Sequence, residues 1–146
     1  QDLTDPETSP EMVAQAVGRV HAAIEIVDDR HADYSVLHCG TLIADNSWNA
    51  GVVLGAFTPP PAKMEEATGV AYLDGSEFAR GLGADVLGHP YVPLAWLANH
   101  LAASGRMLRK GDIVMTGSIV TTRFPTGPFT YRFDVSGIGS VEVSGS

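Results

Sequence analysis

The sequence predicts an α+β protein whose sheet is largely antiparallel or mixed. Two segments, Pro10–Val20 and Pro93–Ser104, carry apolar residues at helical spacing, while most other apolar residues fall into short strand-like runs. A length of 146 residues with 45% hydrophobic and 18% charged residues describes one globular domain. We therefore expect a single domain over residues 1–146 in which strands outnumber helices.

The first predicted helix has a well-marked start. Ser9 is suited to the N-cap position and Pro10 to the first helical position. Residues 1–9 before it are acidic and rich in turn formers, which predicts a linker. The apolar residues that recur at helical spacing are Met12, Val13, Ala16, Val17 and Val20. The helix leads into the strand-like run Ala22–Val27.

The middle of the chain predicts turns and short strands. The segment Asp45–Asn49 is rich in side chains that bond their own backbone, so we place it in a turn. Gly51–Leu54 is expected to be a short buried strand. Val70–Arg80 is expected to form a β-hairpin whose turn is Asp74-Gly75.

The last third of the chain predicts one helix and three strands. Gly105 is a natural stop for the helix that begins at Pro93. We expect strands at Ile113–Met115, at Phe129–Val135, where large apolar side chains alternate with polar ones, and at Ser140–Val143.

Composition excludes several classes of function. A net charge of −8 without any run of Lys or Arg argues against nucleic-acid binding. The single cysteine, Cys39, excludes an internal disulfide and a cysteine-based metal cluster. No apolar run approaches the roughly 20 residues that span a bilayer. We expect a cytoplasmic protein that binds neither nucleic acid nor membrane.

One carboxylate occupies an unusual position. Glu25 lies in the middle of the apolar run Ala22–Val27. An ionised carboxylate is costly to bury without a partner, so Glu25 requires a cation, a hydrogen-bond network or an open cleft. The pattern is compatible with two roles for Glu25. It is either a metal ligand or an edge-strand residue that faces solvent or pairs with Arg30. We expect Asp28 and Arg30 to form a structural ion pair at the end of the strand.

Several short motifs follow one another in a recognisable order. They are Ile24–Asp28, Ala44–Ser47, Val53–Gly55, Gly81–Gly83, Val86–Pro90, Ala95–Asn99, Lys110–Ser118 and Gly137–Val143. No single motif is diagnostic. The ordered set resembles the 2-keto-4-pentenoate hydratase and 4-oxalocrotonate decarboxylase branch of the fumarylacetoacetate hydrolase superfamily. The resemblance implies a mixed, strand-rich flattened β-roll or barrel with flanking helices, like the C-terminal catalytic domain of that family.

The resemblance also implies a divalent metal. In this family the glutamate that matches Glu25 is one of three carboxylate ligands of Mg²⁺, for which Mn²⁺ is the expected substitute. The other two ligands come from an earlier Glu-x-Glu strand that this chain lacks, since Glu65-Glu66 lies in the wrong place. The lysine and aspartate that the family uses for proton transfer belong to the same N-terminal segment. We therefore expect that another part of the protein or another chain supplies these groups, or that the site is inactive.

Two loops are implied to contact the substrate. Ser47 matches a family position that hydrogen-bonds the substrate carboxylate, and Thr116 matches a loop at the mouth of the same site. We expect both residues to be catalytic and Glu25 to be the metal ligand. Gly117 and Ser118 are expected to bind substrate together with Ser47, because glycine lets the backbone approach a ligand closely. The cleft is expected where Glu25, Ser47 and Thr116 converge.

The implied activity is that of a lyase, either a hydratase or a decarboxylase, on a small unsaturated 2-oxo acid. Mg²⁺ prefers hard oxygen ligands and keeps water-filled positions, so such an acid can chelate it through its carboxylate and 2-oxo oxygens. The bound metal stabilises an enolate, which supports either water addition or loss of a distal carboxylate. Expected partners are the substrate and either further copies in a homo-oligomer or a complementary N-terminal chain.

Two alternatives to the lyase remain open. A shortened relative without metal would bind or cyclise a bulkier hydrophobic ligand, with Pro59–Pro61 and the loop Ile119–Pro125 as candidate rim elements. A non-catalytic partner of a full-length subunit is the other alternative, which the missing Glu-x-Glu strand favours. Mg²⁺ binding distinguishes the lyase from both.

Overall fold

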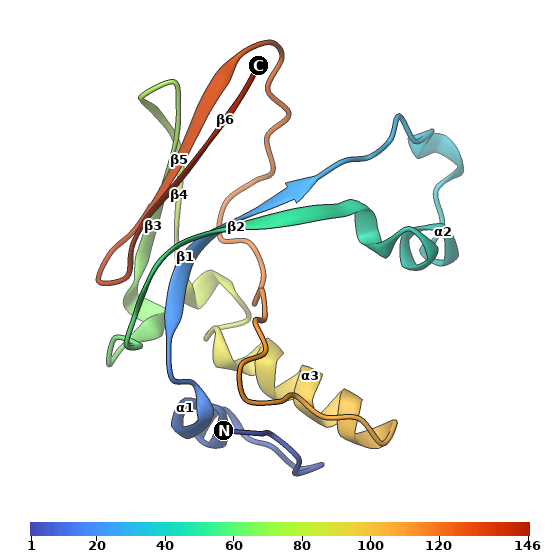
Figure 1. Ribbon diagram of the computed structural model, residues 1–146, viewed down its shortest axis with the longest axis vertical. Coiled ribbons are helices and arrows are strands. Elements are labelled where there is room, and N and C mark those ends of the chain that lie inside the picture. Colours follow the sequence, from blue (N-terminus) through green and yellow to red (C-terminus); the bar gives the residue numbers. More distant parts are fainter.

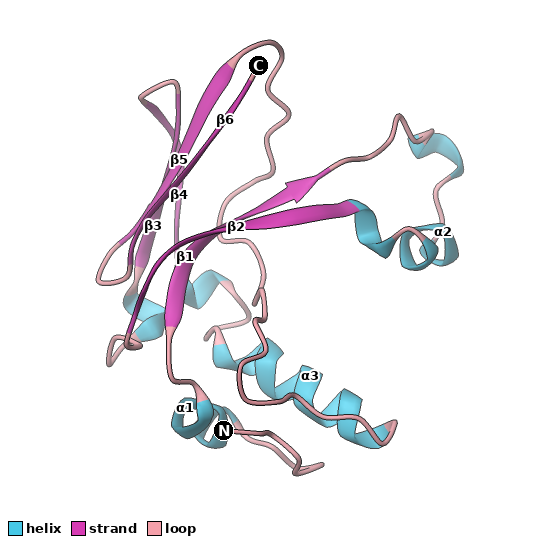
Figure 2. Ribbon diagram, in the orientation of Figure 1, coloured by secondary structure: helices cyan, strands magenta, loops and turns pink.

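The computed structural model describes residues 1–146 and contains two antiparallel sheets and three α-helices, which confirms the α+β class (Figures 1 and 2). The helices are α1 (Pro10–Ala16), α2 (Cys39–Ala44) and α3 (Tyr91–Ala103). The strands are β1 (Val20–Val27), β2 (Asn49–Thr58), β3 (Thr68–Leu73), β4 (Ser76–Leu82), β5 (Phe129–Val135) and β6 (Gly139–Gly145). Short 3₁₀ turns connect several of them.

The strands form a two-stranded ribbon and a four-stranded sheet. Strands β1 and β2 pair only with each other, and the larger sheet has the order β4-β3-β5-β6 with every neighbouring pair antiparallel. The ribbon crosses the larger sheet and continues outward to α2, while α1 and α3 lie together at the opposite end from the C-terminus (Figure 1). The region between ribbon and sheet is therefore framed by strands on two sides.

A glycine allows the ribbon to lie close to the sheet. A Cβ atom at Gly55 of β2 would lie 2.4 Å from the carbonyl oxygen of Ser140 in β6 and 3.2 Å from that of Ala22 in β1. Real Cβ atoms do not approach backbone oxygens so closely, so only glycine fits here. Ala22 is buried at the same crossing, with 1% of its surface exposed. This contact fixes the position of β1 relative to β5 and β6.

The predicted hairpin is confirmed. Strands β3 and β4 are joined at Asp74 and Gly75, whose φ angles are +51° and +80°. Two consecutive positive φ angles are typical of the tight turn whose twist matches that of the flanking strands. The Asp74 N–H donates to the Thr130 carbonyl, and its carboxylate accepts from the Thr130 N–H, both at 2.8 Å. The turn is therefore tied to the start of β5.

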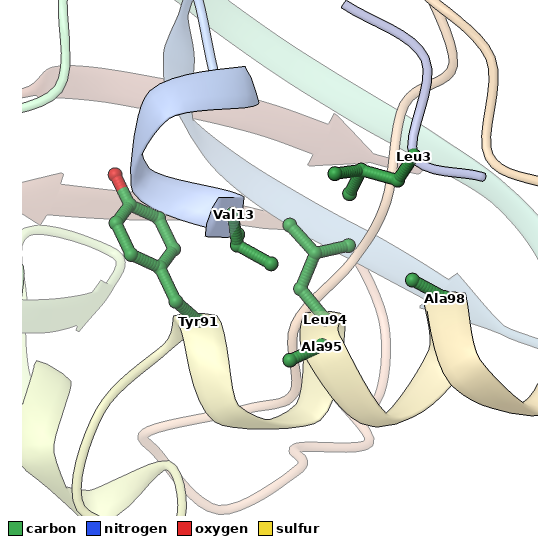
Figure 3. Packing of buried hydrophobic residues seen from close by; sticks show 6 residues of the cluster. All are labelled: Leu3, Val13, Tyr91, Leu94, Ala95 and Ala98. Carbon is green, nitrogen blue, oxygen red and sulfur yellow. The ribbon is translucent and has the colours of Figure 1, made fainter. Parts of the chain in front are cut away.

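The best-buried core lies between the two longer helices and the N-terminal segment (Figure 3). Val13 of α1 is completely buried against the apolar side of α3. The cluster comprises Leu3, Val13, Tyr91, Leu94, Ala95 and Ala98. The predicted start of α1 is present, because Ser9 Oγ accepts the N–H of Met12 at 3.3 Å and Pro10 begins the helix.

Residues 1–9, which the sequence predicts to be a linker, pack against the C-terminal half of the fold. Leu3 forms an isolated antiparallel bridge with Leu108 and is buried. Thr8 is also buried, and its N–H donates to Asn99 Oδ1 of α3 at 2.7 Å. The segment thus belongs to the same packed unit as α3.

The short buried strand predicted at Gly51–Leu54 is part of a longer, half-exposed one, because β2 has ten residues and Val52 and Leu54 are 40% and 37% exposed.

Two further element predictions are wrong at specific places. The first helix ends at Ala16 and not at Val20, because Val17 is already extended and Val20 pairs with Thr58 in the ribbon. The predicted strand Ile113–Met115 has no strand partner and lies in an irregular segment, with Ile113 64% exposed. Its apolar composition resembles that of a strand, but composition does not create a hydrogen-bonding neighbour.

None of the helices is both long and apolar enough to cross a membrane.

Replacement of Gly55 by alanine is expected to destabilise the fold. The new methyl group would meet the backbone of β6, and overpacking of this kind costs about 1–3 kcal/mol. Gly51→Ala is the matched control, since Gly51 lies on the same strand and nothing lies within 4 Å of its added Cβ. Urea denaturation should show the loss for Gly55→Ala only; equal effects would contradict the assigned crossing.

Candidate functional site

A cleft of about 340 Å³ lies where the ribbon faces the larger sheet. One wall is residues 21–27, which include most of β1, and the second wall is Met115 with residues 117–125. The irregular chain that follows α3 passes the ribbon on its way to β5, so it forms this second wall (Figure 1). The cleft thus depends on the crossing of ribbon and sheet.

The third wall of the cleft is largely aromatic. The four side chains that the sequence predicts to share one face of β5 all line it, and Val143 of β6 joins them. The four are Phe129, Tyr131, Phe133 and Val135. A small organic molecule would therefore meet an apolar surface with only a few polar groups, which is the usual character of a ligand site.

Glu25 provides the only carboxylate in the cleft lining. Its side chain is exposed, and Oε1 accepts a hydrogen bond from Asn49 Nδ2 at 2.7 Å across the ribbon. Glu25 takes part in none of the five ion pairs of the structure, so the interpretation that pairs it with Arg30 is wrong. An oriented carboxylate beside an amide is a hard-oxygen donor set, the kind that Mg²⁺ prefers.

The chain by itself does not complete a metal site. No group of three or more His, Cys, Asp or Glu side chains lies close enough together to hold a metal ion. Glu25 and the carbonyl oxygen of the Asn49 side chain fit a divalent cation only as part of a larger ligand set. Further carboxylates would have to come from polypeptide other than the residues described here.

Three other titratable side chains line the cleft, and the sequence analysis did not assign them to the site. Arg123 falls in the loop predicted to be a rim, and Tyr131 falls in the alternating strand, so both had a local signal. His21 had none. Its Nδ1 lies 2.9 Å from the carbonyl oxygen of Gly55. Because a carbonyl oxygen only accepts hydrogen bonds, Nδ1 carries a proton in this contact.

Ser47 lies outside this cleft, in the turn that precedes β2. Asn46, Ser47 and Trp48 have φ angles of +50°, +50° and +64°, a left-handed run that is rare for residues other than glycine. The turn leads directly into Asn49, so Ser47 is two residues from the partner of Glu25. Ser47 is exposed, and it lies just before the end of β2 that carries Asn49.

An ion pair holds this turn, although not the predicted one. Arg30 pairs with Asp45, and the expected pair between Arg30 and Asp28 is wrong. Asp28 instead accepts the backbone N–H of Arg30 at 2.9 Å, while its own N–H donates to the carbonyl of Trp48. A short carboxylate such as Asp28 reaches the backbone two residues later more easily than the guanidinium beyond it.

The predicted substrate loop is only partly in the cleft. Gly117 and Ser118 line it together with Glu25, while Thr116 between two lining residues does not. Gly117 has a φ of +118°, a conformation that L side chains rarely adopt. The Ser118 hydroxyl donates to the carbonyl of Val120 at 2.6 Å, which shapes the loop. The structure thus brings Glu25, Gly117 and Ser118 together and leaves Ser47 and Thr116 at its margins.

Known proteins are similar to this chain along almost its whole length. No family model matches the chain. A 2-keto-4-pentenoate hydratase of Paraburkholderia phymatum is 35% identical over 99% of the chain and 55% of the relative. A Pseudomonas 4-oxalocrotonate decarboxylase is 30% identical over 88% of the chain and 50% of its own length. Over almost its whole length the chain is similar to members of the hydratase and decarboxylase branch of the fumarylacetoacetate hydrolase superfamily.

The fold agrees with that of a solved member of the branch. A 4-oxalocrotonate decarboxylase from Pseudomonas putida G7, complexed with magnesium and adipate, superimposes with a TM-score of 0.88 at 26% identity. The match covers 97% of this chain and 54% of the decarboxylase. The chain therefore spans about half the length of the relatives that it matches.

The left-handed turn offers a test of the local structure. A non-glycine residue in this conformation carries a cost of roughly 1–2 kcal/mol, so Ser47→Gly should be more stable than Ser47→Ala by about 1 kcal/mol. Both variants lack the hydroxyl, which isolates the backbone effect. Thermal denaturation of the two proteins makes the comparison. A more stable alanine variant would show that Ser47 is not left-handed.

Proposed function

We propose that this chain forms one side of a metal-dependent lyase site that hydrates or decarboxylates a small unsaturated 2-oxo acid. The observation that carries the proposal is Glu25, a single oriented carboxylate at an apolar cleft. The relatives of this chain include enzymes named as hydratases and decarboxylases, and the structure of one decarboxylase was solved with magnesium and adipate. The choice between hydration and decarboxylation depends on groups beyond Glu25.

The residues of this chain would hold and orient the reactants. Glu25 would bind a divalent cation, with Asn49 fixing its carboxylate through the 2.7 Å hydrogen bond. The cation, when bound, supplies Lewis-acid polarisation of a chelated 2-oxo acid. Gly117 and Ser118 would place backbone and hydroxyl groups against the substrate. The aromatic face of β5 would exclude bulk water from its hydrocarbon chain.

We further propose that Ser47 and Thr116 reach the substrate when the site is completed. Ser47 is exposed on a turn next to Asn49, and Thr116 lies between two residues that line the cleft. Both therefore lie within a few residues of groups already at the site, one on each side. Thr116 and Ser47 would donate hydrogen bonds to the substrate carboxylate and to the groups that develop charge.

The missing ligands would come from polypeptide that covers the ribbon. Val52 lies directly opposite Glu25 in the register, and Val52 and Leu54 remain 40% and 37% exposed. We propose that this apolar face packs against polypeptide equivalent to the unmatched part of the relatives, which also brings the missing carboxylates. This chain would then correspond to the C-terminal catalytic domain, and homo-oligomer formation is the alternative way to cover the face.

The aromatic wall supports a second candidate function. Phe129 and Phe133 give the cleft an apolar surface that would suit a hydrophobic ligand without any metal. The loop Ile119–Pro125 contributes to this surface, as expected for a rim, whereas Pro59–Pro61 lies outside it. Mg²⁺-independent binding of an apolar compound would favour this function over the lyase.

Loss of Glu25 should abolish metal-dependent chemistry. In protein purified together with any polypeptide that co-elutes, Glu25→Gln is expected to weaken Mg²⁺ binding by at least about tenfold, because an anionic ligand is lost. Isothermal titration measures the affinity, and turnover of a 2-hydroxydienoate measures the activity. Activity of the variant should fall together with metal affinity.

Glu142→Gln is the matched control for this substitution. Glu142 is an exposed strand glutamate outside the cleft, so the variant has the same change of charge without loss of a ligand. Equal Mg²⁺ affinities for both variants would contradict the lyase proposal. So would a wild-type protein that turns over the dienoate at the same rate in EDTA.

A further inference from the structure

Arg123 is the only permanently charged cation that lines the cleft. Glu25 is the only carboxylate there, so the cleft contains one fixed charge of each sign together with His21 and Tyr131. If Glu25 serves a metal ion, the guanidinium has a separate role. A cation in a ligand cleft most often recognises an anionic group of the ligand.

The guanidinium has no anionic partner within the protein. Arg123 is absent from all five ion pairs, which involve Arg30, Lys63, Arg80, His89 and Arg132. Arg132, which also stacks on a ring, pairs with Asp134, whereas Arg123 makes no hydrogen bond within the protein. Its N–H donors are therefore available to a bound molecule.

Aromatic contacts place the Arg123 side chain. Its Cζ lies 4.8 Å from the centroid of the Phe78 ring, a cation–π contact. Phe78 in turn meets Tyr131 edge-on, with ring centroids 5.6 Å apart. A guanidinium packed on a ring face keeps its edge open, and it is the edge that forms paired hydrogen bonds with a carboxylate. The contact thus orients Arg123 without using its donors.

Tyr131 adds a neutral donor beside this cation. Burial raises the pKa of its hydroxyl above the ordinary value, and the nearby positive charge of Arg123 acts in the opposite direction without reversing the shift. The phenol therefore remains protonated at neutral pH and can donate a hydrogen bond. Arg123 and Tyr131 both line the cleft, so an anionic group there would meet a charged and a neutral donor.

We propose that the cleft binds 2-oxo acids that carry a second carboxylate at the far end of the chain, and that Arg123 pairs with this distal carboxylate. The inference rests on the proposed function, in which the metal on Glu25 takes the first carboxylate and the 2-oxo oxygen. The aromatic side chains Phe129 and Phe133 would contact the hydrocarbon between the two anionic ends. A volume of about 340 Å³ is within the range of small-molecule sites.

The inference makes Arg123 a determinant of specificity rather than of the chemical step. A hydrogen-bonded pair between charged groups corresponds to roughly a 10- to 100-fold change in affinity. The chain should therefore discriminate between ligands that differ only in the distal carboxylate. A residue that merely supports the loop would affect both ligands alike.

The test compares 2-oxoadipate with 2-oxohexanoate, which have the same number of carbons and the same chelating end. Isothermal titration is carried out with Mg²⁺ on the protein and any co-eluting polypeptide. The wild type should bind 2-oxoadipate at least about tenfold more tightly than 2-oxohexanoate. Arg123→Gln should reduce this preference to within about twofold and leave 2-oxohexanoate affinity unchanged, while Arg123→Lys should retain part of it.

Arg109→Gln is the matched control, because Arg109 is exposed and outside the cleft, and it should keep the wild-type preference. The inference would be overturned if the wild type bound the two acids equally tightly. It would also be overturned if Arg123→Gln lost affinity for both acids to the same extent. Titrations in EDTA separate it from the proposed function. A preference that depends on Arg123 but not on Mg²⁺ supports the distal site while contradicting the metal-dependent lyase.

Discussion

The close backbone contact between the ribbon and β6 is the constraint on which the site depends. At Gly55 the ribbon approaches the carbonyl of Ser140 too closely for any side chain, and Ala22 is buried at the same crossing. This contact holds β1 beside the aromatic face of β5, and the chain that follows α3 forms the remaining wall of the cleft. The orientation of Glu25 is set separately, by the ribbon register and by Asn49. A shift at the crossing would therefore displace the carboxylate from the aromatic wall without breaking its hydrogen bond.

Burial is unevenly distributed, and the distribution parallels the proposed roles. The helices and the N-terminal segment share a closed core around Val13, whereas the ribbon exposes the apolar side chains of Val52 and Leu54 beside Glu25. Only 15 of 146 residues are buried, so much of the sheet surface has no cover within the chain. This open apolar face also carries Glu25, the proposed metal ligand. Both features are consistent with a chain that spans about half the length of its relatives. The helical end contains the closed core, and the strands line the proposed site.

Local signals predicted the elements that depend on local physics. The Asp74-Gly75 turn, the cap at Ser9 and the alternation of β5 follow from short-range rules, and the structure contains all three. The failures involve long-range pairing. The helical spacing extends to Val20, but Val20 instead pairs with the other strand of the ribbon. The segment Ile113–Met115 has the composition of a strand but no strand partner. For the site, the sequence indicated Glu25 through its unusual position, but only the fold brings Glu25 of β1 to the same cleft as Arg123 and Tyr131, because these two residues lie near the C-terminal end of the chain.

The proposed site binds one end of the ligand through a metal on Glu25 and the other end through Arg123. Its most direct test is anomalous diffraction from crystals grown with Mn²⁺ and 2-oxoadipate, using the protein together with any co-eluting polypeptide. The account predicts an anomalous peak at coordination distance from the Glu25 carboxylate, with the 2-oxo end of the ligand on the metal and the far carboxylate at the Arg123 guanidinium. A peak bound elsewhere, or a ligand whose far carboxylate lies away from Arg123, would contradict it.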